Sequence, residues 1–398
     1  MKTLKKLNAC LMALVMLTAL FAPFSANAQN SRISPLDKNK VKLHCALWGD
    51  PQVSNYLKER EPYVISSAKD IKNSASRIDA LVLAGDITEN SIADEWEWVY
   101  NDIKDTGVKN YITATGNHDI RIHDYDTARE SFTSFTNRLN KKAGSKLRIN
   151  KLYYSYTLKG YKFIVLGSEK SLLEEAEISK KQLSWLDKEL KDGYKKNHPT
   201  FVIVHQPLKN THGLPDTWGS SIKSAGTVGV QSDAIKKILN KYAGTVLITG
   251  HLHTGFGKYT YQKIGNIQSV NLPSVAIDNE DGSYNDNGIG YMMEVYGNEI
   301  VFRARNFDKG VYVPKYDIRV NLYIKSAKLS KKTYKYDGKA KKPKVKIVDV
   351  YGNKVSKKYY KVIYPKGRKK PGTYKIKIIF KGKYKKAKPL TRKFKIKK

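Results

Sequence analysis

Thr115-Gly116-Asn117-His118-Asp119 follows the apolar stretch 111–114 and places several chemically useful side chains at the end of a predicted strand. Asparagine offers a neutral carbonyl oxygen that can bind a metal, and histidine offers a proton near neutral pH. One turn therefore supplies a candidate ligand, Asn117, and a candidate general acid, His118. An isolated Asn-His pair is more often an Asx turn that closes a buried strand. The functional interpretation therefore depends on the rest of the chain.

The same arrangement, an apolar run followed by a metal-competent polar residue, occurs at four other places. The residues that follow these runs are Gly49-Asp50, Gly85-Asp86, His205 and Gly250-His251-Leu252-His253. In open α/β sheets, ligands bind outside the carboxyl ends of the strands. We therefore expect the five strand ends to converge on one site.

The N-terminus has the pattern of a secretory signal peptide. Basic residues precede the apolar run 11–21, and Ala26-Asn27-Ala28 supplies a small-x-small cleavage site. The apolar run is shorter than the ~20 residues that span a bilayer, so we expect no transmembrane anchor. Cleavage after Ala28 would give a secreted or cell-wall-associated protein. It would also remove Cys10, so the single remaining Cys45 could form no internal disulfide.

The positive charge is concentrated in the C-terminal tail. The whole chain carries a net charge of +37, whereas residues 321–398 contain 30 Lys and Arg against two acidic residues, Asp337 and Asp349. The tail therefore contributes +28 and the signal peptide +3, which leaves +6 for residues 29–320. The chemistry of the longer part should not be inferred from the charge of the whole chain.

Apolar runs alternate with amphipathic segments up to about Asp317. The amphipathic segments predict five helices, at 56–71, 91–103, 126–139, 179–190 and 232–239. Hairpins are predicted around Lys159-Gly160 and Gly297-Asn298, which suggests a second, partly antiparallel sheet. The alternation favours an α/β layered domain. From Asn321 onward, short alternating strands at 345–347, 374–378 and 394–396 predict a small β-sandwich with lysine on its exposed face.

These motifs, in their order along the chain, resemble those of the calcineurin-like metallophosphoesterase superfamily over roughly residues 41–315. The motifs are Asp50-x-Gln52, Gly85-Asp86, Gly116-Asn117-His118-Asp119, His205 and Gly250-His251-x-His253. The tail is similar to the immunoglobulin-like surface modules of secreted bacterial enzymes. The resemblance implies a four-layer αββα sandwich followed by a small all-β immunoglobulin-like sandwich. We expect a signal peptide at 1–28, a metallophosphoesterase domain at 29–320 and a basic accessory domain at 321–398.

The resemblance also implies two metal ions bridged by the carboxylate of Asp86, since two cations ~3.5–4 Å apart need a shared anion. Asp50 and His253 would complete one metal site, and Asn117, His205 and His251 the other. Mixed imidazole, carboxylate and amide ligands suit manganese, iron or zinc, and the sequence does not choose among these metals.

Gln52 departs from the family pattern, because the first motif usually reads Asp-x-His. The side chain of Gln52 either coordinates a metal through its carbonyl oxygen or hydrogen-bonds to a metal-bound water. The sequence leaves both alternatives open.

By resemblance, the function is hydrolysis of phosphomonoesters or phosphodiesters, with a hydroxide generated at the metals attacking phosphorus. Asp86 and His118 are the expected catalytic residues, with His118 protonating the leaving alkoxide. Either Glu89 or Asp119 would hold the imidazole of His118 in its protonated form. The Gly-Asp-Ile-Thr-Glu-Asn stretch at 85–90 disfavours the serine/threonine protein phosphatase branch.

Substrate recognition is expected to involve Asn117, Arg121 and His212. Further loop candidates are His123, Asn210, Asp216 and Trp218. The alternative function is a catalytically inactive surface protein that acts through its basic tail. For that tail we expect an anionic cell-wall polymer as partner and no specific nucleic acid, and for the whole chain a monomer.

Overall fold

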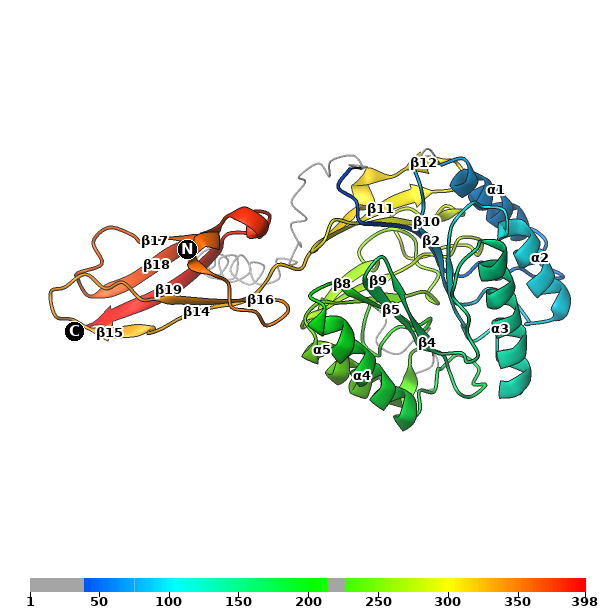
Figure 1. Ribbon diagram of the computed structural model, residues 1–398, viewed down its shortest axis with the longest axis horizontal. Coiled ribbons are helices and arrows are strands. Elements are labelled where there is room, and N and C mark those ends of the chain that lie inside the picture. Colours follow the sequence, from blue (N-terminus) through cyan, green and yellow to red (C-terminus); the bar gives the residue numbers. More distant parts are fainter. Residues whose placement is uncertain (1–38, 75, 214–225) are drawn as a thin grey trace, which may run out of the picture. The chain divides into compact units, whose positions relative to one another are not determined.

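The computed structural model describes residues 39–74, 76–213 and 226–398. Two β-sheets organise the larger part of these residues (Figure 1). The first sheet contains, in spatial order, β12 (Val311–Tyr312), β11 (Glu299–Asn306), β10 (Ile289–Val295), β1 (Leu43–Trp48), β2 (Ala80–Ala84) and β3 (Tyr111–Ala114), with β13 (Ile318–Asn321) beside β11. The second sheet contains β4 (Tyr154–Leu158), β5 (Tyr161–Val165), β6 (Thr200–Ile203), β7 (Thr245–Thr249), β9 (Ile267–Asn271) and β8 (Tyr261–Ile264).

Both sheets are mixed rather than purely parallel or antiparallel. Strands β1, β2 and β3 run parallel, as do β5, β6, β7 and β9. The two predicted hairpins are present as β4–β5 and β10–β11. The expected second, partly antiparallel sheet is present and contains the β4–β5 hairpin, because β5 pairs with β6. The other hairpin belongs to the first sheet, where β10 pairs directly with β1. Each hairpin therefore extends the edge of a different parallel core.

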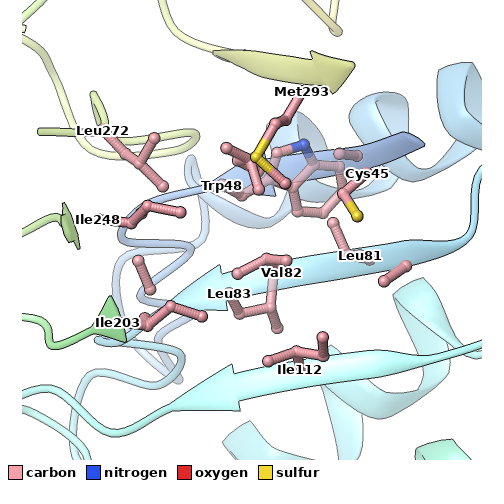
Figure 2. Close-up of a cluster of buried hydrophobic side chains, with 14 of the residues drawn as sticks. Cys45, Trp48, Leu81, Val82, Leu83, Ile112, Ile203, Ile248, Leu272 and Met293 are labelled. Atoms are coloured by element: carbon pink, nitrogen blue, oxygen red, sulfur yellow. The ribbon is translucent and has the colours of Figure 1, made fainter. Parts of the chain in front are cut away.

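Side chains of the second sheet point alternately to its two faces, and each face packs in a different hydrophobic layer. Phe163, Phe201 and Ile248 belong to the core cluster that includes the residues of the first sheet. Their chain neighbours point the other way and pack beneath the helices of the second half. Figure 2 shows the layer between the sheets, where Ile203 and Ile248 lie near Leu83. The sheets thus pack face to face, and the side chains of their inner faces form one hydrophobic core.

Five helices cover the outer faces of the sheets, as the amphipathic segments predict (Figure 1). They are α1 (Glu61–Lys72), α2 (Ala93–Ile103), α3 (Tyr125–Lys142), α4 (Lys180–Lys195) and α5 (Ser232–Lys241). Helix α1 begins five residues later than predicted, and Pro62 occupies its first turn, where a missing backbone N–H costs nothing. The Ser179 hydroxyl caps α4 by accepting a hydrogen bond from the backbone N–H of Gln182. With the helices, the two sheets form four layers in the order αββα.

The tail contains two additional β-sheets. One pairs β14 (Ile324–Leu329) with β16 (Val345–Asp349). The other places β15 (Thr333–Lys335), β19 (Leu390–Lys397), β18 (Gly372–Phe380) and β17 (Tyr360–Ile363) side by side. The three strands expected from alternation lie within β16, β18 and β19. Inward side chains such as Ile376, Ile378 and Phe394 form two small hydrophobic clusters.

The segment expected to be a signal peptide lies outside the described residues. Among the residues that are described, no helix has the length and apolar character needed to cross a bilayer. Cys45 is free and fully buried in β1, and burial raises the pKa of its thiol above the ordinary range. Its environment is that of a core residue rather than a nucleophile.

Candidate metal centre

Five strand ends meet where the two sheets approach each other. Asp50 follows β1, Asp86 follows β2 and Asn117 follows β3 in the first sheet, while His205 follows β6 and His251 follows β7 in the second. A backbone contact joins the two groups, because Val275 N–H, which follows β9 of the second sheet, donates to Gly49 O over 2.9 Å. Within the second group, Gly250 N–H donates to His205 O over 2.8 Å. The structure therefore brings the sequence-predicted ligands together, although they are up to about 200 residues apart in the chain.

The backbone is strained at most of these positions. Residues other than glycine rarely adopt a positive φ, and each such residue costs on the order of 1–3 kcal/mol. Positive φ angles of 48°, 40°, 45°, 74° and 45° occur at Asp50, Gln52, Asp86, His251 and His253. Such clustering is typical of functional sites, because the surrounding structure must impose a conformation that the residues do not favour.

Two glycines are required by the close approach of other groups. A Cβ atom at Gly116 would lie 2.0 Å from Asp86 Oδ1, and one at Gly85 would lie 2.6 Å from the ring of His205. Gly85 also has a φ of +97°. The glycines of the Gly-Asp and Gly-Asn-His-Asp motifs therefore make room for the side chains that form the site.

Asp86, His205 and His251 form the centre of the cluster. All three are buried, and one ligand atom from each lies within 4.8 Å of the others. His205 Nε2 is 2.9 Å from Asp86 Oδ2, and His251 Nδ1 is 3.2 Å from His205 Nε2. His205 Nδ1 donates to Ala84 O over 2.8 Å, which fixes the ring so that Nε2 faces the cluster.

The charges in this cluster depend on one another. Burial opposes the charged form of His205, but Asp86 and Asp50 raise the pKa of His205 to about 9. Burial likewise opposes ionisation of Asp86, yet His205 and His118 hold the pKa of Asp86 below its ordinary value. Burial and the proximity of His205 lower the pKa of His251. The buried carboxylates of Asp86 and Asp50 thus favour positive charge beside them, which protonated His205 can supply and a bound cation would also supply.

Asp50 and His253 lie next to this centre. His253 Nε2 is 3.2 Å from Asp50 Oδ1, and His205 Nε2 is 3.6 Å from the same oxygen. Both carboxylate oxygens of Asp50 accept a hydrogen bond from the backbone N–H of His251, at 3.1 Å each. Asp50 is therefore fixed between the two histidines of the last motif, where it can share a cation with His253.

Asn117 presents its oxygen to the site because its nitrogen is held from the other side. The Asn117 Nδ2 group donates to Glu174 Oε2 over 3.0 Å, and Asn117 Oδ1 is buried without a hydrogen-bond partner. A buried carbonyl oxygen without a partner is costly, and a metal ion would satisfy it. Glu174 was not predicted, since it lies in the loop after β5 with no motif around it.

The side-chain amide of Gln52 is oriented in the same way as that of Asn117, with its nitrogen held and its oxygen unpaired. Gln52 Nε2 donates to Glu89 Oε2 over 2.7 Å, and burial of Gln52 leaves Oε1 without a hydrogen-bond partner. The pKa of Glu89 is lowered to about 2 despite its burial, chiefly by His118 and Arg60, so its carboxylate can only accept hydrogen bonds. The amide nitrogen of Gln52 must therefore face Glu89, and its oxygen is available for a metal or a water.

Glu89 also holds His118. His118 Nδ1 lies 2.9 Å from the backbone oxygen of Glu89 and 3.2 Å from Glu89 Oε1. Burial alone would lower the pKa of His118, but the carboxylates of Asp86 and Glu89 raise it above the ordinary value. Of the two candidates for this role, the structure selects Glu89. Asp119 instead accepts hydrogen bonds from the backbone N–H groups of Ile87, Thr88 and Gly116, and so stabilises the loops.

The substrate-binding candidates divide into three groups. Arg121 is partly exposed and donates to Glu89 Oε1 over 3.2 Å, beside the site. His212 is buried, with Nδ1 at 2.6 Å from Tyr259 O and Nε2 at 2.8 Å from Ser269 Oγ, and burial lowers its pKa to about 4. The expectation that His212 binds substrate does not fit these contacts, since both ring nitrogens are already used. Asp216 and Trp218 lie outside the described residues, Asn210 is exposed, and His123 is partly buried.

The donor set fits a metal centre. It combines two buried carboxylates, three imidazoles and two amide oxygens, of which Asn117 Oδ1 and Gln52 Oε1 lack hydrogen-bond partners. Imidazole with carboxylate ligation suits zinc, manganese or iron. Two groups of ligands were predicted, one for each metal ion. The group around Asp86, His205 and His251 is the more complete, because its ligand atoms already lie within 4.8 Å of one another.

Comparison with known proteins agrees with this geometry. The family description "Calcineurin-like phosphoesterase" matches residues 47–255. Among solved structures, a dimetal phosphatase from Danio rerio is similar with 14% identity and a TM-score of 0.50, over 71% of this chain and 99% of that one. A purple acid phosphatase from yellow lupin (Lupinus luteus) has the same identity and TM-score, over 70% of this chain and 53% of that one. At these identities the likeness concerns the fold. No curated protein sequence matches the chain.

Proposed function

Because this chain belongs to the calcineurin-like phosphoesterase family, we propose that it hydrolyses phosphomonoesters or phosphodiesters with two metal ions at the Asp86 centre. The convergence of Asp86, His205 and His251 within 4.8 Å carries the proposal. The intact set of ligands argues against the alternative of an inactive surface-binding protein. The resemblance to a dimetal phosphatase supports two ions rather than one.

The ligands would divide into two groups that share Asp86. Asp50 and His253 would hold one ion, joined by Gln52 through its free Oε1, and Asn117, His205 and His251 would hold the other. When bound, such a pair of ions acidifies water to give a nucleophile at neutral pH and offsets charge on the phosphoryl oxygens.

The remaining residues position the substrate and move protons. His118 is held by Glu89, and the nearby carboxylates favour its protonated form, so it can donate a proton to the leaving oxygen. Arg121, which is partly exposed beside His118, can contribute guanidinium N–H groups to a phosphate oxygen. Glu174 keeps the amide of Asn117 turned with its oxygen toward the site.

A secreted, wall-associated location is part of the same proposal. It rests on the signal-peptide pattern that ends at Ala28 and on the basic composition of residues 321–398. We assign residues 29–320 to the catalytic domain and the tail to an immunoglobulin-like accessory domain. Two β-sheets with hydrophobic clusters on their inward side chains support this reading of the tail.

The test is hydrolysis of para-nitrophenyl phosphate and bis(para-nitrophenyl) phosphate by the purified full chain. Chelation should abolish release of nitrophenol, and addition of manganese, iron or zinc should restore it. The ratio of the two rates assigns monoesterase or diesterase preference. No hydrolysis of either ester by metal-loaded protein would contradict the proposal and favour the inactive binding protein.

A further inference from the structure

One face of the four-stranded sheet in the tail is covered by lysine. The outward positions of β15, β17, β18 and β19 alternate with inward positions that are mostly hydrophobic. Every charged residue at an outward position is a lysine, whereas Arg392 of β19 lies at an inward position and donates to Ala327 O. We call this set the lysine face, and its members are Lys335, Lys361, Lys375, Lys377, Lys393, Lys395 and Lys397. All of them are exposed. The strand register brings them together: Lys375 lies directly opposite Lys393, and Lys335 opposite Lys397.

This arrangement costs stability within the tail. Like charges directly opposite each other on neighbouring strands are destabilising. The two acidic residues of the tail do not offset them, because Asp337 pairs with Lys341 and Asp349 is buried, accepting a hydrogen bond from Tyr384 Oη. Within residues 321–398, all of which are described, no carboxylate therefore neutralises the lysine face. An external anion bound to the lysine face would neutralise it.

The face lacks the groups that recognise bases. Its other outward residues are Thr333, Thr373, Thr391, Ile363 and Ile379. Tyr334 and Tyr374 point inward and pack against Phe394 with ring centroids 5.9 and 5.4 Å away. Binding of single-stranded nucleic acid usually depends on aromatic side chains on which bases stack. The lysine face offers charge without a stacking platform.

We propose that the lysine face binds a linear phosphodiester polymer that carries no bases. That the ligand is a polyanion follows from the unneutralised lysines. That its anionic group is phosphate rests on the proposed function, because a phosphoesterase gains from holding a polymer of phosphate esters near its site. A flat array on strands suits an extended chain, since side chains two residues apart along a strand are separated by about 7 Å and can contact successive charges.

The test compares two full-length variants with equal net charge. The face variant replaces Lys375, Lys377, Lys393 and Lys395 with Thr, which keeps a residue that favours strands. The control variant also replaces four exposed lysines with Thr, but in the loops of the same tail. These lysines are Lys366, Lys369, Lys385 and Lys388. Binding of fluorescent poly(glycerol phosphate) is measured by anisotropy over a range of salt concentrations, and the length of the probe is checked afterwards.

The face variant should bind at least about tenfold more weakly than wild type in low salt, and the slope of log K against log salt should fall by about two to three. The control variant should change affinity less than about threefold. The melting temperature of the face variant should be equal or higher, because the repulsion between Lys375 and Lys393 is removed. Equal losses in the two variants would overturn the assignment to this face.

Two further probes of matched charge number test the chemistry of the ligand. Oligodeoxythymidine should bind no more than about threefold more tightly per phosphate than poly(glycerol phosphate), because the face has no aromatic rings for its bases. Much tighter binding of the oligonucleotide would make the partner a nucleic acid. Equal binding of poly-glutamate would contradict the choice of phosphate. None of these outcomes depends on ester hydrolysis, so the proposed function can fail or hold independently.

Discussion

His118 is the residue whose role can be separated from metal binding. It contacts Glu89 through its ring and is not among the proposed ligands. We expect His118→Ala to keep its metal content and to lose activity on an alkyl phosphate ester by about 10²–10⁴-fold, the usual contribution of a general acid. With a nitrophenyl ester, whose leaving group needs little protonation, the loss should be smaller.

The matched control for this variant is His198→Ala. His198 is exposed and precedes β6, at the opposite end of that strand from His205. Its replacement should leave hydrolysis of both esters unchanged. Full activity of His118→Ala on the alkyl ester would show that another group protonates the leaving oxygen.

Asp86 should matter more for metal content than Asp50. Asp86 contacts His205 directly and is the carboxylate proposed to serve both ions, whereas Asp50 would serve one. Asp86→Asn should therefore lose both metals, and Asp50→Asn mainly one, as measured by elemental analysis of purified protein. The bridging role would be wrong if Asp86→Asn retained two metals per chain.

Substitution of Gln52 tests the role of the residue that stands where the family pattern has histidine. Its Oε1 is buried without a hydrogen-bond partner, while its nitrogen is held by Glu89. Gln52→His would replace a weak neutral oxygen donor with an imidazole, so the first metal should be held more tightly in competition with a chelator. Weaker retention of metal in this variant would indicate that residue 52 does not point at the ion.

Among the helices, α2 carries a carboxylate in an unfavourable position near its C-terminus. Asp102 lies in the last turn of α2, where the helix dipole disfavours an anion, and that turn has no basic residue. Burial, with a smaller effect of Glu61, raises its pKa to about 7. The native state therefore binds more protons than the unfolded state between about pH 4 and pH 7, and stability falls as pH rises through this range.

The Asp102→Asn substitution should remove this loss of stability at higher pH. We expect the free energy of unfolding at pH 8 to rise by on the order of 1–2 kcal/mol, with no gain at pH 4, because one pKa unit corresponds to about 1.4 kcal/mol before screening by solvent. Urea unfolding at the two pH values provides the measurement. Asp105→Asn, at an exposed residue 3.4 Å from Lys142, is the control and should change stability by less than about 1 kcal/mol at either pH. A gain for Asp102→Asn that was the same at both pH values would point to packing rather than charge.

Strand ends explain why much of the site could be predicted from the sequence. Asp50, Asp86 and His205 each follow an apolar run, and parallel strands deliver their carboxyl ends to one edge. Helices with a clear apolar period were also predicted, although the start of α1 was shifted by Pro62. Such features depend on local spacing, which the sequence displays directly.

Contacts between distant loops could not be predicted in this way. Glu174 reaches Asn117 across 57 residues, and Arg60 reaches Glu89 across 29 residues, without any motif around either one. His212 was expected to bind substrate, because it lies in a loop of glycine, proline and polar residues. It is buried instead, because Tyr259 and Ser269 satisfy both ring nitrogens, and a loop composition does not reveal such partners.

In the whole molecule, the proposed catalytic centre depends on two sheets that meet. The first sheet contributes Asp50, Asp86 and Asn117, and the second contributes His205 and His251. Neither sheet alone holds a complete set of ligands, so loss of metal should loosen the contact between them. The tail adds a charged surface that the chemistry of this centre does not require.

A titration of chelated full-length protein with a metal that restores activity tests whether catalysis depends on two ions. Bound metal per chain and the rate of bis(para-nitrophenyl) phosphate hydrolysis are measured on the same samples. We expect the rate to rise with bound metal and to reach its maximum at two ions per chain. Full activity without bound metal, or two bound ions without activity, would contradict this expectation.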